Sequence, residues 1–338
     1  MKQLIKPNKL NVGDTVATIS ISGGRAGDDD LLWRYLLGKK RLQNVFGINV
    51  IETPNALKGT DFLYKNPKAR AEDLMWALKN PNIKGIIANM GGDDSARLLP
   101  YIDFDVIHDN PKVLMGYSDI TTLTIYFAYA GVMSYYGANV LTPIAQPGSI
   151  DSYTEKSIHK TIFANEIIGE VLPCGKFTKI EWQDKRSEEI EWTTNTGYEL
   201  IQGTGTVKGR LIGGSGGPLR QIMGTFVYPK ESEWKDSIVF LEAYSPYNSV
   251  LAGLHELRAL NASGVFCSAK GLITTNLNKE EKEMLLRFLK YEVEREDMPV
   301  LTNIDFGHRT PMTVLPVGAM AEINCEKQTF SILESGVS

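Results

Sequence analysis

The chain has 338 residues, 43% of them hydrophobic, and a formal net charge of -4. This length and apolar content allow a sizeable core and predict two domains. The weakly negative charge argues against a nucleic-acid partner, because such proteins carry a basic patch or stripe. No apolar run approaches the roughly 20 residues that a membrane span needs, so we expect no membrane association.

The cysteines and the N-terminus both indicate a reducing, cytoplasmic location. The first residues, MKQLIKPNKLNVGDTV, lack the apolar stretch of a secretory signal. Cys174, Cys267 and Cys325 are scattered and form no CxxC pair, so neither a disulfide framework nor a zinc site is indicated. We therefore expect no bound metal and no cofactor.

The first half of the chain alternates predicted strands and helices. The strands are Asp14–Ser22, Ile48–Ile51, Ile83–Met90 and Val113–Met115, and the helices are Asp29–Val45, Lys68–Leu78 and Ile120–Ala130. This alternation predicts a parallel sheet covered on both faces. Sites in such sheets gather beyond the carboxyl ends of the strands, where this chain places small or polar turns such as Gly91-Gly92 and Tyr117-Ser118.

The second half differs in composition. We expect a first domain over residues 1–165, a connecting loop over 166–205 that carries Trp182 and Trp192, and a second domain over 206–338. The expected strands of the second domain are Val207–Ile212, Ile238–Leu241, Leu272–Thr275, Val300–Asp305 and Ala319–Ile323, and its helices are Val250–Ala262 and Lys279–Glu296.

The segment Lys112–Thr122 (KVLMGYSDITT) has the layout of a nucleophile elbow. An apolar strand runs through a glycine into Tyr-Ser-Asp, and a helix follows. Such a turn exposes the serine hydroxyl above the sheet and points the next backbone N–H at a developing oxyanion. The pattern departs from G-x-S-x-G at Ile120, and on this pattern alone Ser118 or Asp119 could equally cap the helix.

A nucleophilic serine needs a base and an orienting acid. Of the four histidines, His308 is the best candidate base, because it follows the apolar strand Pro299–Phe306 and lies on a loop beyond the strand end. Glu242 ends the strongly apolar segment SIVFL and is a candidate acid. Asp305 also lies near a strand end and is the competing acid, and the sequence does not decide between them.

Several blocks of the sequence together resemble the LD-carboxypeptidase and microcin-immunity (MccF-like) family of serine peptidases. These blocks are GYSDIT at 116–121, LE at 241–242, DFGHRTPMTVLPVGA at 305–319, Gly91-Gly92 before SARLLPYIDF, GRLIGGS at 209–215 and LRALNASGVF at 257–266. They occur in the family's order and span nearly the whole chain. The resemblance is therefore more specific than any single motif.

This resemblance implies an α/β fold with a flavodoxin-like N-terminal domain and a smaller β-rich, swivelling or barrel-like C-terminal domain. It implies a homodimer. It also implies a catalytic triad of Ser118, Glu242 and His308, with the backbone N–H groups of Gly92 and Asp119 as the oxyanion hole.

The family has two branches that differ in substrate. One trims murein tetrapeptides, and the MccF-like branch cleaves a bond between an aminoacyl or peptidyl part and a modified nucleotide. The long loop with tryptophans is similar to a loop of the MccF-like branch. A tryptophan there could stack on a purine or only anchor the loop. Besides Trp182 and Trp192, we expect Gly91, Asp93 and Ser215 to contact substrate. Asp93-Asp94 depart from the residues usual in either branch, and Ser215 departs from the residue usual in the immunity branch.

We therefore expect a serine peptidase or amidase that acts on a small peptide or peptidyl-nucleotide through an acyl-enzyme. The alternative within the class is a murein tetrapeptide LD-carboxypeptidase. A third interpretation, from a different class, is a noncatalytic protein that binds a small ligand.

Overall fold

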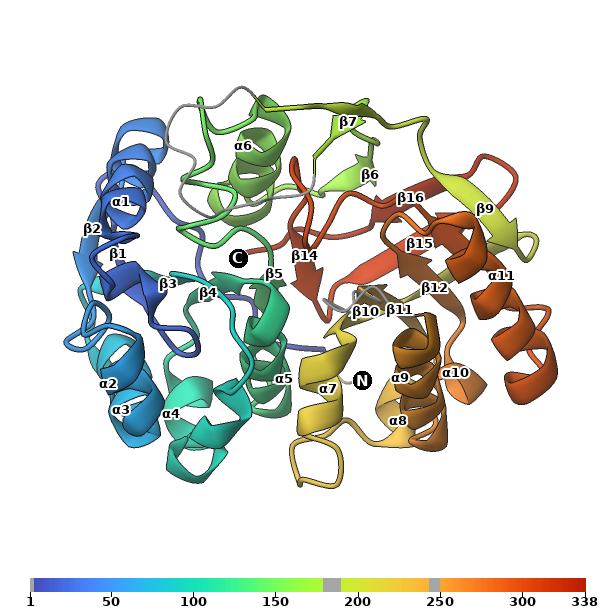
Figure 1. Cartoon of the computed structure of the whole chain (residues 1–338), viewed down its shortest axis with the longest axis horizontal. Helices are drawn as coiled ribbons and strands as arrows, with labels where there is room; N and C mark the ends of the chain where they lie inside the picture. The colour runs from blue at the N-terminus through green and yellow to red at the C-terminus, as the bar shows by residue number, and fades with distance from the viewer. Residues whose placement is uncertain (1–2, 179–189, 243–249) are drawn as a thin grey trace.

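The structure is a computed structural model that describes residues 3–178, 190–242 and 250–338. Within these ranges the chain forms a six-stranded sheet, an eight-stranded sheet and a two-stranded ribbon, with helices packed around them (Figure 1). No helix in these ranges is long and apolar enough to cross a membrane.

The first sheet is mostly parallel and has a flavodoxin-like strand order. In spatial order its strands are β2 (Asn49–Glu52), β1 (Thr15–Ile19), β3 (Ile83–Ala88), β4 (Val113–Gly116), β5 (Ser134–Tyr136) and β14 (Leu315–Val317). The first five run parallel in the order 2-1-3-4-5, which is the order of flavodoxin-like sheets. Strand β14 comes from near the C-terminus and pairs antiparallel with β5.

Neighbouring residues of these strands enter two different cores. Val16 and Ile87 pack in one apolar cluster, and Ala17 and Ile86 pack in the other. This division follows from the alternation of side chains along a strand. Helix α1 (Leu32–Phe46) covers one face, and α3 (Pro67–Lys79), α4 (Phe104–Asp109) and α5 (Thr121–Tyr129) cover the other (Figure 1). The predicted strands and helices of this half are confirmed.

The second sheet is mixed. In spatial order it consists of β6 (Gly169–Val171), β16 (Thr329–Ile332), β15 (Met320–Asn324), β10 (Thr206–Ser215), β11 (Ser237–Glu242), β12 (Gly271–Thr274), β13 (Val300–Thr302) and β9 (Glu199–Gln202). Strands β10 to β13 are mutually parallel, and the others pair antiparallel. The expected α/β class, with a second, β-rich part, is confirmed. The edge strands β6 and β9 lie in the range for which we expect a connecting loop.

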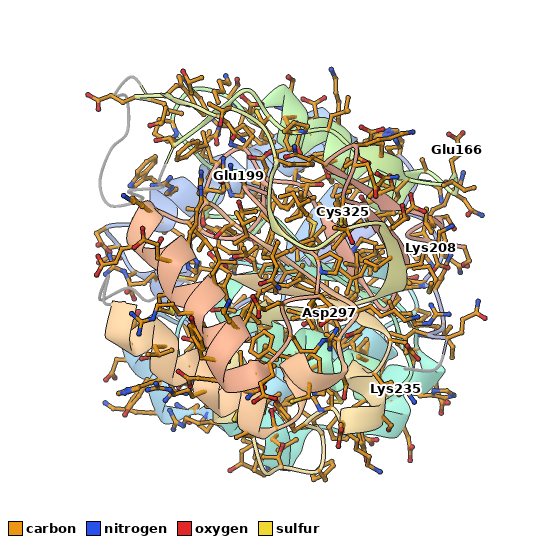
Figure 2. All side chains as sticks on the ribbon, turned by 90° about the vertical axis from the view of Figure 1, so that its right-hand side faces the viewer. Glu166, Glu199, Lys208, Lys235, Asp297 and Cys325 are labelled. Atoms are coloured by element: carbon orange, nitrogen blue, oxygen red, sulfur yellow. The ribbon has the colours of Figure 1, made fainter. Side chains whose placement is uncertain are left out.

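The helices α9 (Val250–Ala262) and α11 (Lys279–Phe288) lie beside this sheet. A π-helical turn, Leu289–Val293, extends α11. Several charged side chains of this half, among them Glu199, Lys208 and Asp297, lie at its surface (Figure 2).

The remaining elements are short. They are η1 (Arg25–Gly27), α2 (Thr60–Lys65), η2 (Ser95–Tyr101), η3 (Ser118–Ile120), α6 (Ser152–Ile158), η4 (His159–Phe163), β7 (Lys176–Phe177), β8 (Thr193–Thr194), α7 (Gly216–Gln221), α8 (Glu231–Trp234) and α10 (Val265–Ser268).

Candidate active site

Ser118 lies in a sharp turn between β4 and α5, as predicted for an elbow. Its φ is +66°, in the left-handed region that non-glycine residues seldom adopt. Tyr117 is the N-cap residue of η3, and Ile120 is the N-cap residue of α5. The Ser118 side chain therefore caps neither helix. A strained, partly exposed serine at a strand-to-helix turn is the geometry of a nucleophile.

The glycine pair after β3 lies directly against this turn. A Cβ placed on Gly91 would lie 2.8 Å from the Cβ of Ser118 and 3.3 Å from the backbone nitrogen of Asp119. A Cβ on Gly92 would collide with the hydroxyl of Ser22. Both positions therefore require glycine, Gly91 because the loop passes close to Ser118 and Gly92 because it passes close to Ser22.

The carboxylate of Asp119 is completely buried beneath the elbow. Its Oδ2 accepts hydrogen bonds from the Ser22 hydroxyl, at 2.5 Å, and from the Ser95 amide, at 2.8 Å. Burial raises the pKa of Asp119, and the hydrogen bonds from Ser22 and Ser95 oppose that shift. The side chain therefore joins the loops after β1 and β3 to the turn, while its backbone nitrogen lies beside Gly91.

Glu242 and His308 form a close pair. Glu242 ends β11 and is 1% exposed, and its Oε1 lies 2.6 Å from Nδ1 of His308. The same oxygen accepts a hydrogen bond from the backbone N–H of His308. The carboxylate therefore holds His308 at two points, the ring Nδ1 and the backbone N–H, and favours the tautomer with a proton on Nδ1.

The electrostatics of this pair favour a charged carboxylate. Burial alone would raise the pKa of Glu242, but the charge of His308 and the hydrogen bonds from His308 and Tyr136 lower it. For His308, burial lowers the pKa, and the charge and hydrogen bond of Glu242 outweigh burial and raise it. Such mutual shifts are typical of an orienting acid beside a general base.

Gly307 allows the histidine loop to reach the carboxylate. Its φ is +75°, and a Cβ at this position would collide with the carboxylate of Glu242. The ring of His308 then packs edge-on against Tyr117, with 5.2 Å between the ring centroids. The candidate base therefore contacts the residue that directly precedes Ser118.

Asp305, the competing acid, is engaged elsewhere. It is completely buried, and its Oδ1 accepts from Asn195 at 3.1 Å and lies 2.8 Å from the guanidinium of Arg309. Its Oδ2 accepts from the backbone N–H of Cys174 at 2.7 Å. Burial raises the pKa of Asp305 to about 6, against the effect of Arg309. This carboxylate fastens Cys174 and Asn195, both within the expected connecting loop 166–205, to the loop that carries His308.

Two expected substrate contacts lie near the elbow. Ser215 pairs with Glu242 across β10 and β11, and its backbone N–H donates to the hydroxyl of Thr121 at 2.9 Å. Asp93 is exposed beyond the glycine pair, and its backbone oxygen accepts from the side chain of Gln221. Asp94, by contrast, forms ion pairs with the buried Arg70 at 2.7 Å and with Arg97 at 2.8 Å.

Of the two tryptophans expected to contact substrate, Trp192 lies within the described residues. Trp192 is 37% exposed, and the ammonium of Lys176 lies 4.0 Å from its ring centroid. Lys176 in turn pairs with Asp151 at 3.0 Å. Trp182 lies outside the described residues. No group of three or more His, Cys, Asp or Glu side chains within the described ranges is arranged to hold a metal ion.

The sequence analysis missed Tyr136, which is completely buried beside the pair. Its hydroxyl lies 2.8 Å from Oε2 of Glu242 and 3.1 Å from the backbone nitrogen of Ser118. The one signal for it is its place at the end of a short strand next to β4, and that strand was not predicted.

Comparison with known proteins agrees with this arrangement. Residues 16–137 match the LD-carboxypeptidase N-terminal domain, and residues 208–323 match the LD-carboxypeptidase C-terminal domain. The microcin C7 self-immunity protein MccF of Escherichia coli is 28% identical, over 97% of this chain and 96% of its own length. A Bacillus subtilis (strain 168) protein described as a probable murein peptide carboxypeptidase is also 28% identical, over 98% of this chain and 95% of its own.

Solved structures resemble the whole chain. An MccF-like protein from Streptococcus pneumoniae in complex with AMP has a TM-score of 0.86 and 27% identity, covering 95% of this chain and 98% of its own. MccF in complex with glutamyl sulfamoyl guanosine has a TM-score of 0.85 and 26% identity, covering 99% and 100%. With both domains matched in order, this chain belongs to the LD-carboxypeptidase family of serine peptidases, which includes the MccF-like hydrolases.

Proposed function

We propose that the chain hydrolyses an amide bond with Ser118 as nucleophile, His308 as general base and Glu242 as orienting acid. The observation that carries this proposal is the 2.6 Å contact between Glu242 and Nδ1 of His308, made beside a serine in a left-handed turn. A protein that only binds a ligand has no need of a buried carboxylate held against an imidazole.

In the proposed reaction, His308 takes the hydroxyl proton of Ser118 while the serine oxygen attacks the amide carbonyl carbon. The amide C–N bond then breaks, and His308 returns the proton to the leaving nitrogen. Water, activated by the same imidazole, releases the acyl group from Ser118. Glu242 stabilises the imidazolium that exists between these transfers.

The oxyanion of each tetrahedral intermediate needs backbone donors. We assign this role to the N–H groups of Asp119 and Gly92. Asp119 directly follows the nucleophile, and Gly92 follows the glycine that packs against it. The nearby start of α5 adds positive potential.

For the substrate, we propose an aminoacyl- or peptidyl-nucleotide. Two solved structures that resemble the whole chain hold AMP and glutamyl sulfamoyl guanosine. Trp192 offers a partly exposed ring on the segment that Asp305 fastens to the histidine loop. A murein tetrapeptide is the alternative substrate, and the similarity to the probable murein peptide carboxypeptidase favours it.

The direct test is mass spectrometry of the products formed from an aminoacyl-sulfamoyl adenosine and, separately, from a murein tetrapeptide. We expect release of the amino acid from the first substrate. Loss of terminal alanine from the tetrapeptide alone would support the alternative. If neither is cleaved and a fluorophosphonate fails to label Ser118, the proposed chemistry is wrong.

A further inference from the structure

A single buried hydroxyl connects the candidate nucleophile to the candidate acid. The phenol oxygen of Tyr136 lies 3.1 Å from the backbone nitrogen of Ser118 and 2.8 Å from Oε2 of Glu242. Ser118 belongs to the first sheet's elbow, and Glu242 ends a strand of the second sheet. Tyr136 therefore joins the two parts of the site across the two sheets.

The direction of both hydrogen bonds follows from the chemistry of the groups. A backbone N–H can only donate, so the phenol oxygen accepts from Ser118. An ionised carboxylate can only accept, so the phenol proton points at Glu242. The second carboxylate oxygen, Oε1, is then left to bind His308.

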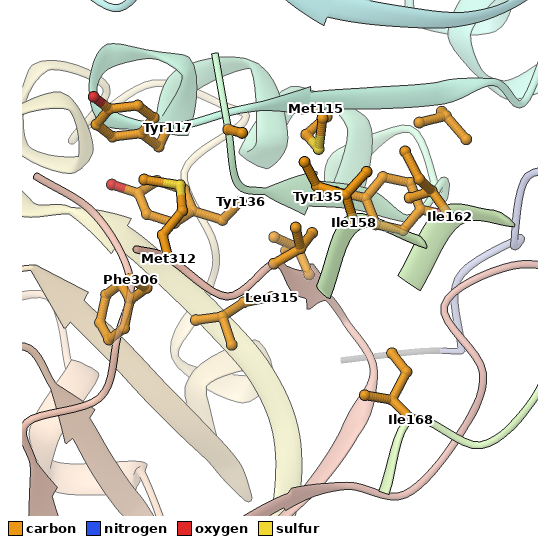
Figure 3. Close-up of a cluster of buried hydrophobic side chains, with 14 of the residues drawn as sticks. Met115, Tyr117, Tyr135, Tyr136, Ile158, Ile162, Ile168, Phe306, Met312 and Leu315 are labelled. Carbon is orange, nitrogen blue, oxygen red and sulfur yellow. The ribbon is translucent and has the colours of Figure 1, made fainter. Parts of the chain in front are cut away.

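The ring of Tyr136 is held on several sides. Its strand pairs with β4 at Gly116 and with β14 at Leu315. The ring contacts Phe240 and Phe306, with centroid distances of 5.4 and 6.2 Å. Figure 3 shows Tyr136 near Tyr117 and Phe306, while Tyr135 points the other way. A ring packed in this way keeps its hydroxyl in place.

We propose that Tyr136 is a positioning residue for hydrolysis. Its hydroxyl fixes the orientation of Glu242, and it accepts the backbone N–H of Ser118, so that this N–H takes no part in the oxyanion hole. The inference rests on the proposed function of Ser118, Glu242 and His308. It adds a fourth side chain that acts through the acid without touching the substrate.

The loss of this hydroxyl has a defined effect on the pH profile. A hydrogen bond donated to the carboxylate stabilises its charged form. Without that bond, the Glu242–His308 pair binds a proton more tightly, and its apparent pKa rises. Activity requires the pair in the form that lacks this proton, so the acid limb of the profile should move to higher pH.

The test compares Tyr136→Phe with Tyr135→Phe. Both tyrosines are completely buried in β5, and the hydroxyl of Tyr135 donates to the carbonyl of Gly336 at 2.8 Å, away from the site. For Tyr136→Phe we expect kcat to fall by about one to two powers of ten with KM nearly unchanged, and the acid limb to rise by about one pH unit. Tyr135→Phe should keep the wild-type kcat and pH profile.

A double-mutant cycle separates a positioning role from a structural one. If Tyr136 acts through Glu242, its removal should cost much less in a Glu242→Gln background than in the wild type. Equal losses in both backgrounds would overturn the inference, as would a Tyr136→Phe enzyme with the kinetics of Tyr135→Phe. Should Tyr136→Phe not fold, 3-fluorotyrosine at position 136 should move the acid limb to lower pH, and an unchanged limb would refute the role.

These outcomes differ from a failure of the proposed function. If wild-type enzyme neither turns over a substrate nor reacts with a fluorophosphonate, the triad itself is wrong. If the wild type is active and the two tyrosine variants behave alike, only the role of Tyr136 fails.

Discussion

Replacing Glu242 by glutamine tests the charge of the acid with little change in its shape. The amide oxygen of the introduced glutamine can still accept from the backbone and ring N–H of His308, and its NH₂ group can donate to the phenol oxygen of Tyr136. The negative charge, however, is lost at a site that is 1% exposed. The variant should therefore fold and fail in the chemical step.

The magnitude follows from the geometry. Nδ1 and Oε1 are 2.6 Å apart, and because both charges are delocalised their centres lie roughly 4 Å apart, which is worth about 4 kcal/mol at an effective dielectric constant of about 20. That interaction exists only when His308 is charged, so its loss should lower kcat by about three powers of ten. The affinity for a nonhydrolysable substrate analogue should stay nearly constant.

The assay is the rate of turnover together with the rate of fluorophosphonate labelling of Ser118, and both should fall. The matched control is Asp305→Asn, a second buried carboxylate that lies three residues before His308 and bonds Arg309, Asn195 and Cys174. It should change stability more than the chemical rate. A Glu242→Gln enzyme within tenfold of wild type, or an equal kinetic loss in a folded Asp305→Asn enzyme, would refute the assignment of the acid.

Four further predictions follow from the site. Ser118→Ala should abolish turnover and labelling while the thermal unfolding transition is retained, and near wild-type turnover would end the serine-hydrolase assignment. Because Glu242 raises the pKa of His308 and the base acts only when neutral, kcat/KM should decrease as the pH falls through an apparent pKa that lies above about 6.5. An acid limb of the profile at or below that value would contradict the pairing. Trp192→Ala should weaken an aminoacyl-nucleotide by about one to two powers of ten and leave peptide cleavage unchanged, whereas equal losses in calorimetric affinity and peptide turnover would mean that the ring only supports its segment. Burial raises the pKa of Glu256 to about 7, so the folded state holds that proton more tightly than the unfolded chain and loses stability as pH rises from about 4.5 to above 7. Relative to wild type, Glu256→Gln should therefore gain about 1 to 3 kcal/mol in urea unfolding between pH 5 and 8.5, and a pH-independent difference would show that the carboxyl is not the cause.

Strands β4, β11 and β12, all predicted from the sequence, are buried along their whole length. Such strands appear as continuous apolar runs that end in small turns, as in Ile83–Met90. Strands β5 and β14 are only three residues long, and their pairing with each other joins segments almost 180 residues apart. Nothing local distinguishes Ser134–Tyr136 or Leu315–Val317 from a loop, so the strand that carries Tyr136 could not be predicted.

The candidate site, like the fold, could be predicted from the sequence only in part. Ser118 and His308 could be singled out because each follows an apolar strand at a turn, and the choice of Glu242 rested on the family resemblance. The distance between acid and base depends on the packing of one loop against another strand, which no local pattern encodes. Tyr136 adjoins a second tyrosine of equal burial, and only the register of β5 with β4 decides which one faces the site.

The crossing of the chain between the two sheets explains how the site is held together. Strand β13 belongs to the second sheet and β14 to the first, and the segment between them carries His308. His308 is therefore anchored on one side to the second sheet, whose strand β11 ends at Glu242, and on the other side to the first sheet, whose strand β4 leads into Ser118. Tyr136 reinforces the same junction, because β14 pairs with its strand. The relative positions of Ser118, His308 and Glu242 thus depend on strand pairing on both sides, and a rigid arrangement of this kind is what the proposed proton transfer over hydrogen-bond distance requires.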